Sequence, residues 1–427
     1  MAMIKILNYG EVENEAIFSR TIPMSTVADT VSEIIETVRQ KGDSALFAYC
    51  KKFDGVELES LQVTEEEFEE GVQSVDAEFR KVLERAAANI CQFHQNQVRS
   101  SFILNNDYRP GVITGQKVLP VAKAGIYVPG GTAAYPSTVL MDAIPAKIAG
   151  VGEIIMVTPP GKDGRISPVI LAAARTAGVD TIFKVGGAQA IAALAYGTQT
   201  IPKVDKIVGP GNAFVAEAKK QVYGAVSIDM IAGPSEILVI ADGNTDPRVV
   251  AADLLSQAEH DRMASAVLLT DSREMAADVQ GELERQMKKL ERYEIARASI
   301  DSNGKIIVVP DIPCAISVAN EIAPEHLELC VDNPFDYLDA IKNAGSVFLG
   351  RSCPEALGDY YAGPNHTLPT GGTARFSSPL SVDDFVKKMQ YTYFTADALE
   401  QAADDVVRFA RQEGLTAHAQ SILSRFR

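Results

Sequence analysis

The sequence contains no tryptophan and few cysteines, and the cysteines form none of the usual metal or redox motifs. They are widely spaced, odd in number and without a CxxC pair, at Cys50, Cys91, Cys314, Cys330 and Cys353. This pattern argues against a disulfide framework or a thiolate zinc site and predicts reduced thiols. A cysteine nucleophile that captures an aldehyde is a second interpretation, but an isolated cysteine is more typical of a small buried hydrophobic residue.

Basic residues are also scarce: 40 Lys and Arg stand against 56 Asp and Glu, a formal net charge of −16. Nucleic acids and anionic membranes are bound through basic groups, so we expect neither as a partner. The first twenty residues hold acidic residues and a glycine where a signal peptide is apolar. Glycines and prolines interrupt the longest uncharged interior run, between Lys123 and Asp142. We therefore expect a cytoplasmic protein without a membrane-spanning helix.

The chain has enough apolar material for two or three domains, because 46% of its 427 residues are hydrophobic. Residues 26–100 are predicted to be helical, since the segments 25–42 and 65–97 carry apolar residues at helical spacing and few helix breakers. His94 lies on the second segment, where we expect an exposed or edge residue of an amphipathic helix.

The middle of the chain alternates short β-rich runs, which end in Gly or Pro, with Ala-rich helical stretches. Strand, helix and strand at this spacing predict parallel βαβ units. Two series of runs predict two successive α/β units, which similar halves would explain. From Ser381 onward we expect helix, in a tail too small to hold its own core, which must dock on the body or on another subunit. The runs are residues 124–131, 153–161, 181–187 and 206–211, then 236–242, 266–271, 305–311 and 344–350.

Three glycine-rich turns follow predicted strands of the first series: Gly130-Gly131, Gly186-Gly187 and residues 209–214. A parallel strand that ends in such a turn and opens a helix points backbone N–H groups at one spot, which suits a pyrophosphate. None of the three is a GxGxxG fingerprint, because Phe214 occupies its last glycine position. Together they favour a nucleotide site at the carboxyl edge of the sheet. Tyr127 would offer a ring there, and Gln189 and Asn212 amides, although Asn212 is equally suited to cap a helix.

A helix that begins at Asp246-Pro247 places Gln257 and His260 at i and i+3, on one face, where both can reach one ion. A histidine near a helix C-terminus can equally interact with the helix dipole. Glu325 and His326 follow Pro324, which fits a first helical position. In an opening turn the dipole favours ionised Glu and neutral His, both of which accept protons at neutral pH, but such an acid is as often only a dipole partner.

Two further histidines stand beside turn signals near the end of the chain. Asp359 and His366 lie in the Gly- and Pro-rich segment 354–372, which is typical of a site wall. Glu413 is predicted to close a helix at Gly414, and Thr416 to cap the next helix with His418 in its first turn. A zinc ion with mixed nitrogen and oxygen ligands is chemically reasonable for such a set.

Segment 227–242, SIDMIAGPSEILVIAD, resembles the signature of the histidinol dehydrogenase family. Further family blocks match in order over nearly the whole chain, among them VGGAQAIAALAYGT, GPGNAFVAEAKK, DLLSQAEHD, APEHLEL and GDYYAGPNHTLPTGG. The resemblance implies an α/β fold of two incomplete Rossmann-like parallel-sheet units with helical N-terminal and C-terminal segments. The implied division is a helical region 1–105, a first NAD-binding unit 106–235, a second unit 236–375 with zinc and catalytic residues, and a helical tail 376–427.

The same resemblance implies a zinc-dependent, NAD-linked oxidation of histidinol through the aldehyde to histidine. It implies homodimers in which the tail of each subunit reaches the active site of its partner. The implied zinc ligands are Gln257, His260, Asp359 and His418; the catalytic pair is Glu325 and His326; the NAD contacts are Tyr127, Gln189 and Asn212; the substrate contacts are Ser235, Gln257, His260, His326, Asp359, Glu413 and His418.

Two other functions are compatible with parts of this pattern. One is a related zinc and NAD dehydrogenase of another polar alcohol, such as a sulfonated diol, which would lack the contacts to a histidine side chain. The other is a nucleotide-binding protein without turnover, which has no need of the Glu325 and His326 pair beside a metal.

Overall fold

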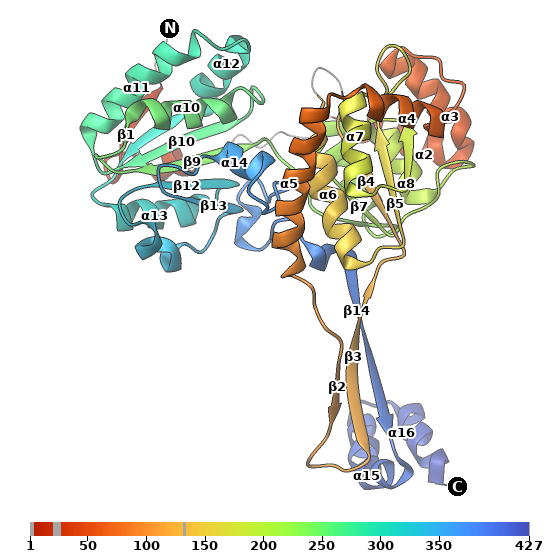
Figure 1. The fold of residues 1–427 in the computed structure, drawn as a ribbon. Helices are drawn as coiled ribbons and strands as arrows, with labels where there is room; N and C mark the ends of the chain where they lie inside the picture. The colour runs from red at the N-terminus through yellow and green to blue at the C-terminus, as the bar shows by residue number, and fades with distance from the viewer. Residues whose placement is uncertain (1–3, 20–26, 131–133, 427) are drawn as a thin grey trace. The chain divides into compact units, whose positions relative to one another are not determined.

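The computed structural model describes residues 4–19, 27–130 and 134–426 (Figure 1). The chain divides into two compact units: unit 1 comprises residues 1–97 and 122–385, and unit 2 comprises residues 98–121 and 386–427. Gly131 of the predicted Gly130-Gly131 turn lies outside the described residues. No helix in the described ranges is long and apolar enough to cross a membrane.

The first series of predicted strands forms one parallel sheet of unit 1, in the order β6-β5-β4-β7-β8 within the described residues. In sequence numbers this is 3-2-1-4-5, the first five places of the six-strand dinucleotide-binding order. The strands are β4 (Lys123–Tyr127), β5 (Glu153–Thr158), β6 (Thr181–Lys184), β7 (Lys206–Val208) and β8 (Ser227–Ile228).

Helices cover both faces of this sheet, because right-handed crossovers place a helix on one side or the other according to the direction of travel. Ile155 and Val157 of β5 point toward α2, α3, α8 and α9, whereas α6 packs on β4 and β5 through the opposite face. The bounds are α2 (Ala28–Lys41), α3 (Asp43–Tyr49), η1 (Cys50–Asp54), α4 (Glu65–Ser74), α5 (Ala77–Gln95), α6 (Pro136–Ala149), α7 (Pro168–Ala177), α8 (Gly187–Tyr196) and α9 (Ala213–Val222).

The second series forms a further parallel sheet, in the described order β1-β11-β10-β9-β12-β13. Without β1 the order is again 3-2-1-4-5, so the two halves share one topology. The α/β fold with two incomplete Rossmann-like sheets is therefore confirmed. The strands are β1 (Lys5–Asn8), β9 (Glu236–Ala241), β10 (Ser265–Thr270), β11 (Lys305–Val308), β12 (His326–Cys330) and β13 (Ser346–Leu349).

Alternate residues of the second sheet enter two separate cores. Ile237 and Val239 of β9 pack with α10, α11 and α12, and Leu238 and Ile240 pack with α13 and α1. Figure 1 shows α10 and α13 on opposite sides of this sheet. The bounds are α1 (Asn14–Phe18), α10 (Pro247–Ala258), α11 (Arg273–Met287), α12 (Tyr293–Asn303), α13 (Ile312–Ile322), η2 (Pro334–Ala340), α14 (Glu355–Tyr360), η3 (Thr373–Arg375) and η4 (Val382–Phe385).

The predicted helix at Glu325 and His326 is wrong, because His326–Cys330 is strand β12. The preceding helix α13 ends at Ala323, which has a left-handed backbone (φ 50°), and the chain after it extends between β9 and β13. All five residues of β12 are buried. Burial on both faces produces a short strand without alternation of apolar and polar residues, which periodicity alone does not separate from a helix.

His94 is not the exposed helix residue that we predicted. Segment 65–97 forms two helices, since Asp76 caps α5 by accepting from the N–H of Phe79. The His94 side chain is fully buried, and its Nε2 accepts from Asn365 Nδ2 at 3.2 Å. Burial lowers the pKa of His94 to about 4. The imidazole is therefore neutral at pH 7, where it joins α5 to the loop before His366.

Unit 2 is built from two segments far apart in sequence. Strand β3 (Val112–Pro120) pairs antiparallel with β2 (Phe102–Asn105) and with β14 (Val386–Phe394), and helices α15 (Ala396–Gln412) and α16 (Thr416–Leu423) follow, before η5 (Ser424–Phe426). The prediction of helix from Ser381 is therefore wrong over β14. Since β1 also joins the second sheet, neither the segment 1–105 nor the segment 376–427 folds as a separate region.

Candidate active site

The residues proposed for nucleotide binding lie at the carboxyl edge of the first sheet. Tyr127 is the last residue of β4, Gln189 lies in the first turn of α8 after β6, and Asn212 precedes α9 after β7. Strands β4 and β7 are neighbours where the strand order reverses, the position at which open α/β sheets bind ligands.

The contacts of these three residues differ. The Tyr127 hydroxyl accepts from the N–H of Gly187 at 3.0 Å, so it fixes the turn that opens α8. Gly187 has a left-handed backbone (φ 67°), and a Cβ there would come within 2.8 Å of Gln189 Oε1, so this turn requires glycine. Asn212 caps α9 by accepting from the N–H groups of Phe214 and Val215. The Asn212 side chain thus fills the capping role that was the alternative to cofactor contact.

The proposed catalytic residues lie at the amino end of β12, beside the amino end of its partner β9 in the second sheet. The backbone of Glu236, the first residue of β9, donates its N–H to Glu325 Oε2 at 2.8 Å. The carbonyl of the same residue lies 2.9 Å from His326 Nδ1. A carbonyl only accepts, so Nδ1 carries the proton and Nε2 keeps its lone pair. His326 Nε2 is buried without a hydrogen-bond partner among the described residues.

Burial shifts the pKa of both residues toward the neutral form. It lowers the pKa of His326 to about 4, helped by His260 and His366 nearby. For Glu325, burial and the charges of Glu236, Asp359 and Glu355 raise the pKa well above its usual range, against the Glu236 hydrogen bond. The lowered pKa of His326 agrees with the neutral imidazole that we predicted. The raised pKa of Glu325 differs from the ionised carboxylate that we predicted, because the residue lies at a buried strand end instead of a helix N-terminus.

Two helix ends bring the proposed metal ligands of unit 1 to this edge. Asp246 caps α10 with Pro247 in its first turn, as predicted, and Gln257 lies in the last turn. His260 follows two residues after the helix ends, instead of standing on its face, and is exposed. Asp359 lies within α14 and not in a loop. His260 acts electrostatically on both His326 and Glu355, which places the group around one spot.

Glu355 and His366 belong to the same group; His366 was predicted only as part of a site wall, and Glu355 was not predicted as a site residue. Ligand atoms of His326, Glu355 and Asp359 lie within 4.8 Å of one another, and Glu355 Oε1 is 3.9 Å from His326 Nε2. His366 Nδ1 donates to the Asp359 carbonyl at 3.1 Å, which leaves its Nε2 free to accept. The i, i+4 spacing of Glu355 and Asp359 would have identified the pair, had the segment been predicted as helix.

The side chain of Gln257 gives the strongest sign of a ligand. It is 1% exposed, and both its amide oxygen and its amide nitrogen are buried without a partner among the described residues. An unpartnered buried amide is costly, so such groups usually have a ligand or water. The hydroxyl of Ser256, the residue before Gln257, donates to Glu355 Oε2 at 3.4 Å. An amide oxygen, imidazoles and carboxylates are the kind of nitrogen and oxygen donor set that suits zinc.

Ser235, Glu413 and His418 stand outside this group. Ser235 immediately precedes β9 and is half-buried, one residue from Glu236. Glu413 closes α15 and His418 lies in the first turn of α16, as predicted, although Leu415 and not Thr416 occupies the cap position. Both are exposed and belong to unit 2, whereas Gln257 and Asp359 belong to unit 1.

The opposite, carboxyl edge of the second sheet is filled by the protein itself. Arg351 after β13 donates to both oxygens of Asp242 at 2.7 Å and to Asp332 at 2.7 Å. These acids follow β9 and β12, the strands at the reversal of the strand order. The crevice that would hold a nucleotide in this half is therefore occupied by an ion-pair cluster, and the chemistry-bearing residues gather at the other end of the same strands.

The family model described as histidinol dehydrogenase matches residues 19–426 of this chain. The chain belongs to the histidinol dehydrogenase family. A histidinol dehydrogenase of Clostridium acetobutylicum is 54% identical over all of this chain and 99% of its own length. One of Bacillus cereus is 53% identical over all of this chain and 96% of its own. The crystal structure of a histidinol dehydrogenase from Elizabethkingia anophelis superposes with a TM-score of 0.94 at 38% identity, covering all of this chain and 99% of that one.

Replacing Gln257 by Leu tests the interpretation of its unpartnered amide. The metal-free variant should be at least as stable as the parent, because an unsatisfied buried amide costs about 1–3 kcal/mol. Its affinity for zinc should fall at least about tenfold, as for loss of a metal-site group. Thermal melting of the metal-free protein and competition with a chelating dye measure the two effects.

Gln286→Leu is the matched control, since the Gln286 amide donates to the Arg248 carbonyl and to Glu282. We expect this variant to lose stability and to keep its zinc affinity. A Gln257→Leu protein that melts lower and binds zinc normally would contradict the assignment.

Proposed function

We propose that the protein oxidises histidinol through the aldehyde to histidine, with NAD as oxidant and one zinc ion per subunit. Family membership over residues 19–426 names the substrate class, and the unpartnered buried amide of Gln257 and the cluster of His326, Glu355 and Asp359 support a metal at the site. A cytoplasmic location remains a prediction from the sequence. Nothing observed favours a sulfonated diol as substrate, and a protein without turnover would not explain the buried, unpartnered Nε2 of His326.

Gln257, His260 and Asp359 would hold the zinc ion, with His418 as the fourth ligand. When bound, zinc supplies a Lewis acid that orients an amino alcohol through its nitrogen atoms. Ser235 and Glu413 are the further proposed substrate contacts. His366, whose free Nε2 accepts a hydrogen bond, is suited to the imidazole N–H of histidinol.

His326 is proposed as the base that takes the hydroxyl proton. Its Nδ1 is anchored to the Glu236 carbonyl, so the ring presents the lone pair of Nε2. With a pKa of about 4 it is neutral, and thus able to accept a proton, at any pH above about 5. The proton accepted in one oxidation must leave before the next, and a low pKa favours that release.

Glu325 is proposed to activate the water that converts the aldehyde to its hydrate. Without a cation its raised pKa keeps the carboxyl protonated. Because Asp359 acts electrostatically on Glu325, a cation held by Asp359 would lower that pKa and favour the carboxylate. Binding of the metal and readiness of the base are therefore coupled in this proposal.

NAD is proposed to bind at the carboxyl edge of the first sheet, against Tyr127, Gln189 and Asn212. When bound, it accepts one hydride in each of the two oxidations. The first turns of α8 and α9 have further backbone N–H groups for its phosphates, besides those of Gly187, Phe214 and Val215, which donate to Tyr127 and Asn212.

We also propose a homodimer in which unit 2 of each subunit completes the site of its partner. His418 and Glu413 belong to unit 2, whereas the other proposed ligands belong to unit 1. The buried hydrophobic side chains among the described residues of unit 2 are few and mostly small: Val112, Ala398, Ala402, Ala403, Val407, Ala410 and Ala419. Unit 2 also exposes large apolar side chains, which are typical of an interface: Phe102, Ile103, Leu104, Met389, Tyr393, Phe394, Val406 and Phe409.

The proposed activity predicts two NADH molecules formed per L-histidinol consumed. The measurement is NADH absorbance at limiting histidinol, before and after removal of the metal by a chelator and after zinc is restored. Activity should disappear with the metal and return with it. One NADH per histidinol, or a rate indifferent to chelation, would contradict the proposal.

Replacing Glu325 by Gln should slow oxidation of the aldehyde more than oxidation of the alcohol, because only the aldehyde step needs activated water. In the parent enzyme, aldehyde oxidation should accelerate as pH rises through the Glu325 pKa, since the carboxylate is the active form. Glu325→Gln should lose that pH dependence. Single-turnover rates started from alcohol and from aldehyde, at several pH values above 5, test the division of roles; equal losses in both would refute it.

Two inactive variants should complement each other if the sites are shared. A subunit with His326→Ala keeps an intact unit 2, and a subunit with His418→Ala keeps an intact unit 1. In a mixed dimer one of the two sites is then complete, so random mixing should restore about a quarter of the parent activity. The measurement is activity after co-refolding of the two purified variants. Absence of recovery, with mixed dimers verified by differential tags, would show that each tail serves its own subunit.

A further inference from the structure

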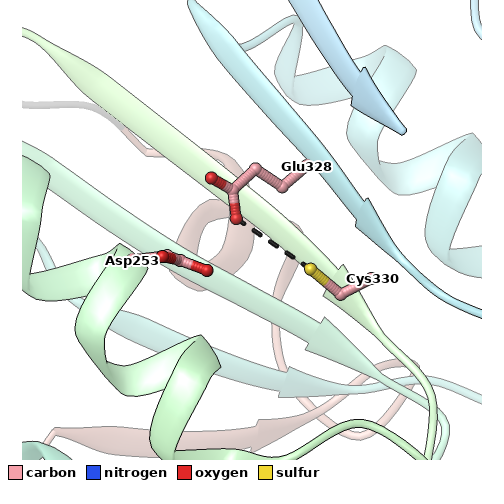
Figure 2. A group of neighbouring side chains, drawn as sticks. All are labelled: Asp253, Glu328 and Cys330. Carbon is pink, nitrogen blue, oxygen red and sulfur yellow. Dashed lines mark hydrogen bonds between the residues drawn. The ribbon is translucent and has the colours of Figure 1, made fainter. Parts of the chain in front are cut away.

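A second cluster of polar side chains lies behind the candidate site, on the α10 face of β12. His326, Glu328 and Cys330 alternate along β12 and therefore share that face. Asp253 of α10 faces Glu328 and Cys330, as Figure 2 shows. Glu328 is 1% exposed, because β12 lies between β9 and β13 in the sheet.

Glu328 is tied to three neighbours. Its Oε1 accepts from the backbone N–H of Glu355 at 2.7 Å. A side-chain hydrogen bond joins it to Asp253, and Cys330 Sγ lies 4.0 Å from Oε2, the contact dashed in Figure 2. Both oxygens of Glu328 are thus engaged within the protein.

This cluster pairs two buried carboxyl groups. Burial and the neighbouring Asp253 raise the pKa of Glu328 to about 9, so its carboxyl holds a proton at neutral pH in the protein without a cation. Burial also raises the pKa of the Cys330 thiol. A proton between Glu328 and Asp253 accounts for the pairing of the two carboxyl groups.

The hydrogen bond from the Glu355 N–H to Glu328 caps the N-terminus of α14. The first N–H groups of a helix have no partner within it and are usually capped by the preceding side chain. Pro354 occupies that cap position in α14 and offers no side-chain acceptor. Glu328 supplies the acceptor instead, from a strand that comes before α14 in the chain. The six-residue helix it caps carries Glu355 and Asp359, two members of the candidate site.

We propose that Glu328 is a positioning residue, which caps α14 from β12 and thereby sets Asp359 and Glu355 in place for the cation. An apolar residue would fill this core position at lower cost than a carboxyl group, but it could not accept from Glu355. The inference rests on the proposed function in one respect, that Asp359 is a zinc ligand.

The test compares Glu328→Gln with Glu328→Met in the full-length protein. Gln keeps the neutral acceptor for Glu355 and a donor for Asp253, whereas Met keeps the size and removes the acceptor. Zinc affinity, measured by chelator competition, should fall at least tenfold in Glu328→Met and change less than threefold in Glu328→Gln. The visible absorption of the cobalt-substituted protein should change in the Met variant alone, since it reports ligand geometry directly.

Asp253→Asn is the control within the cluster, because it removes the charge and leaves the Glu328–Glu355 bond in place. It should bind zinc as the parent does. Comparable loss in Asp253→Asn, loss in Glu328→Gln, or a Glu328→Met protein with parental affinity and cobalt spectrum would each overturn the proposal.

A measurement on the unmodified protein covers the case in which Glu328→Met does not fold. The amide proton of Glu355 should exchange with solvent as slowly as core amides, although first-turn amides of short helices exchange rapidly. Rapid exchange would refute the cap. If the parent protein did not bind zinc, the metal proposal would be refuted. The exchange rate of the Glu355 amide would still test the cap separately.

Discussion

The parallel pairing of β9 with β12 is the contact on which the candidate site depends. It places the backbone of one residue, Glu236, against both Glu325 and His326. Backbone groups cannot rotate away as side chains do, so the carboxyl is oriented and the tautomer of the imidazole is set by the sheet itself. Glu325 and His326 adjoin in sequence, and they contact the N–H and the carbonyl of the same residue, which belong to two successive peptide bonds.

The two halves of unit 1 share a strand order and use opposite ends of it. In the first sheet, the helices that follow β6 and β7 begin at the carboxyl edge and present backbone N–H groups there. In the second sheet the corresponding crevice holds Arg351 with Asp242 and Asp332, and the titratable residues gather at the amino edge, where α10 ends. One topology thus serves two tasks, because the ion-pair cluster closes one end and leaves the other free.

Much of this arrangement could be predicted from sequence. Eight β-rich runs became strands of the two sheets, because apolar runs bounded by Gly and Pro are a strong local signal. Strand β12 was missed because all of its residues are buried. Its charged residues are explained by their contacts in the fold. Strand β14 was missed because its partner β3 (Val112–Pro120) lies far from it in the sequence. The contact between Glu328 and Glu355 could not be predicted either. It depends on the pairing of β12 with its neighbouring strands, which places Glu328 at the N-terminus of α14.

The composition of unit 2 from two distant segments bears on how the protein is made. During synthesis the β2–β3 hairpin emerges early, and β14 follows only with the last residues of the chain. Until then the edge of β3 that pairs with β14 has no partner, and Phe102, Ile103 and Leu104 are exposed on β2 both before and after that pairing. Such edges promote aggregation, and contacts between distant segments slow folding. The nascent chain is therefore most vulnerable between the completion of the first sheet and the release of its final strand, a period in which a chaperone would have the most to protect.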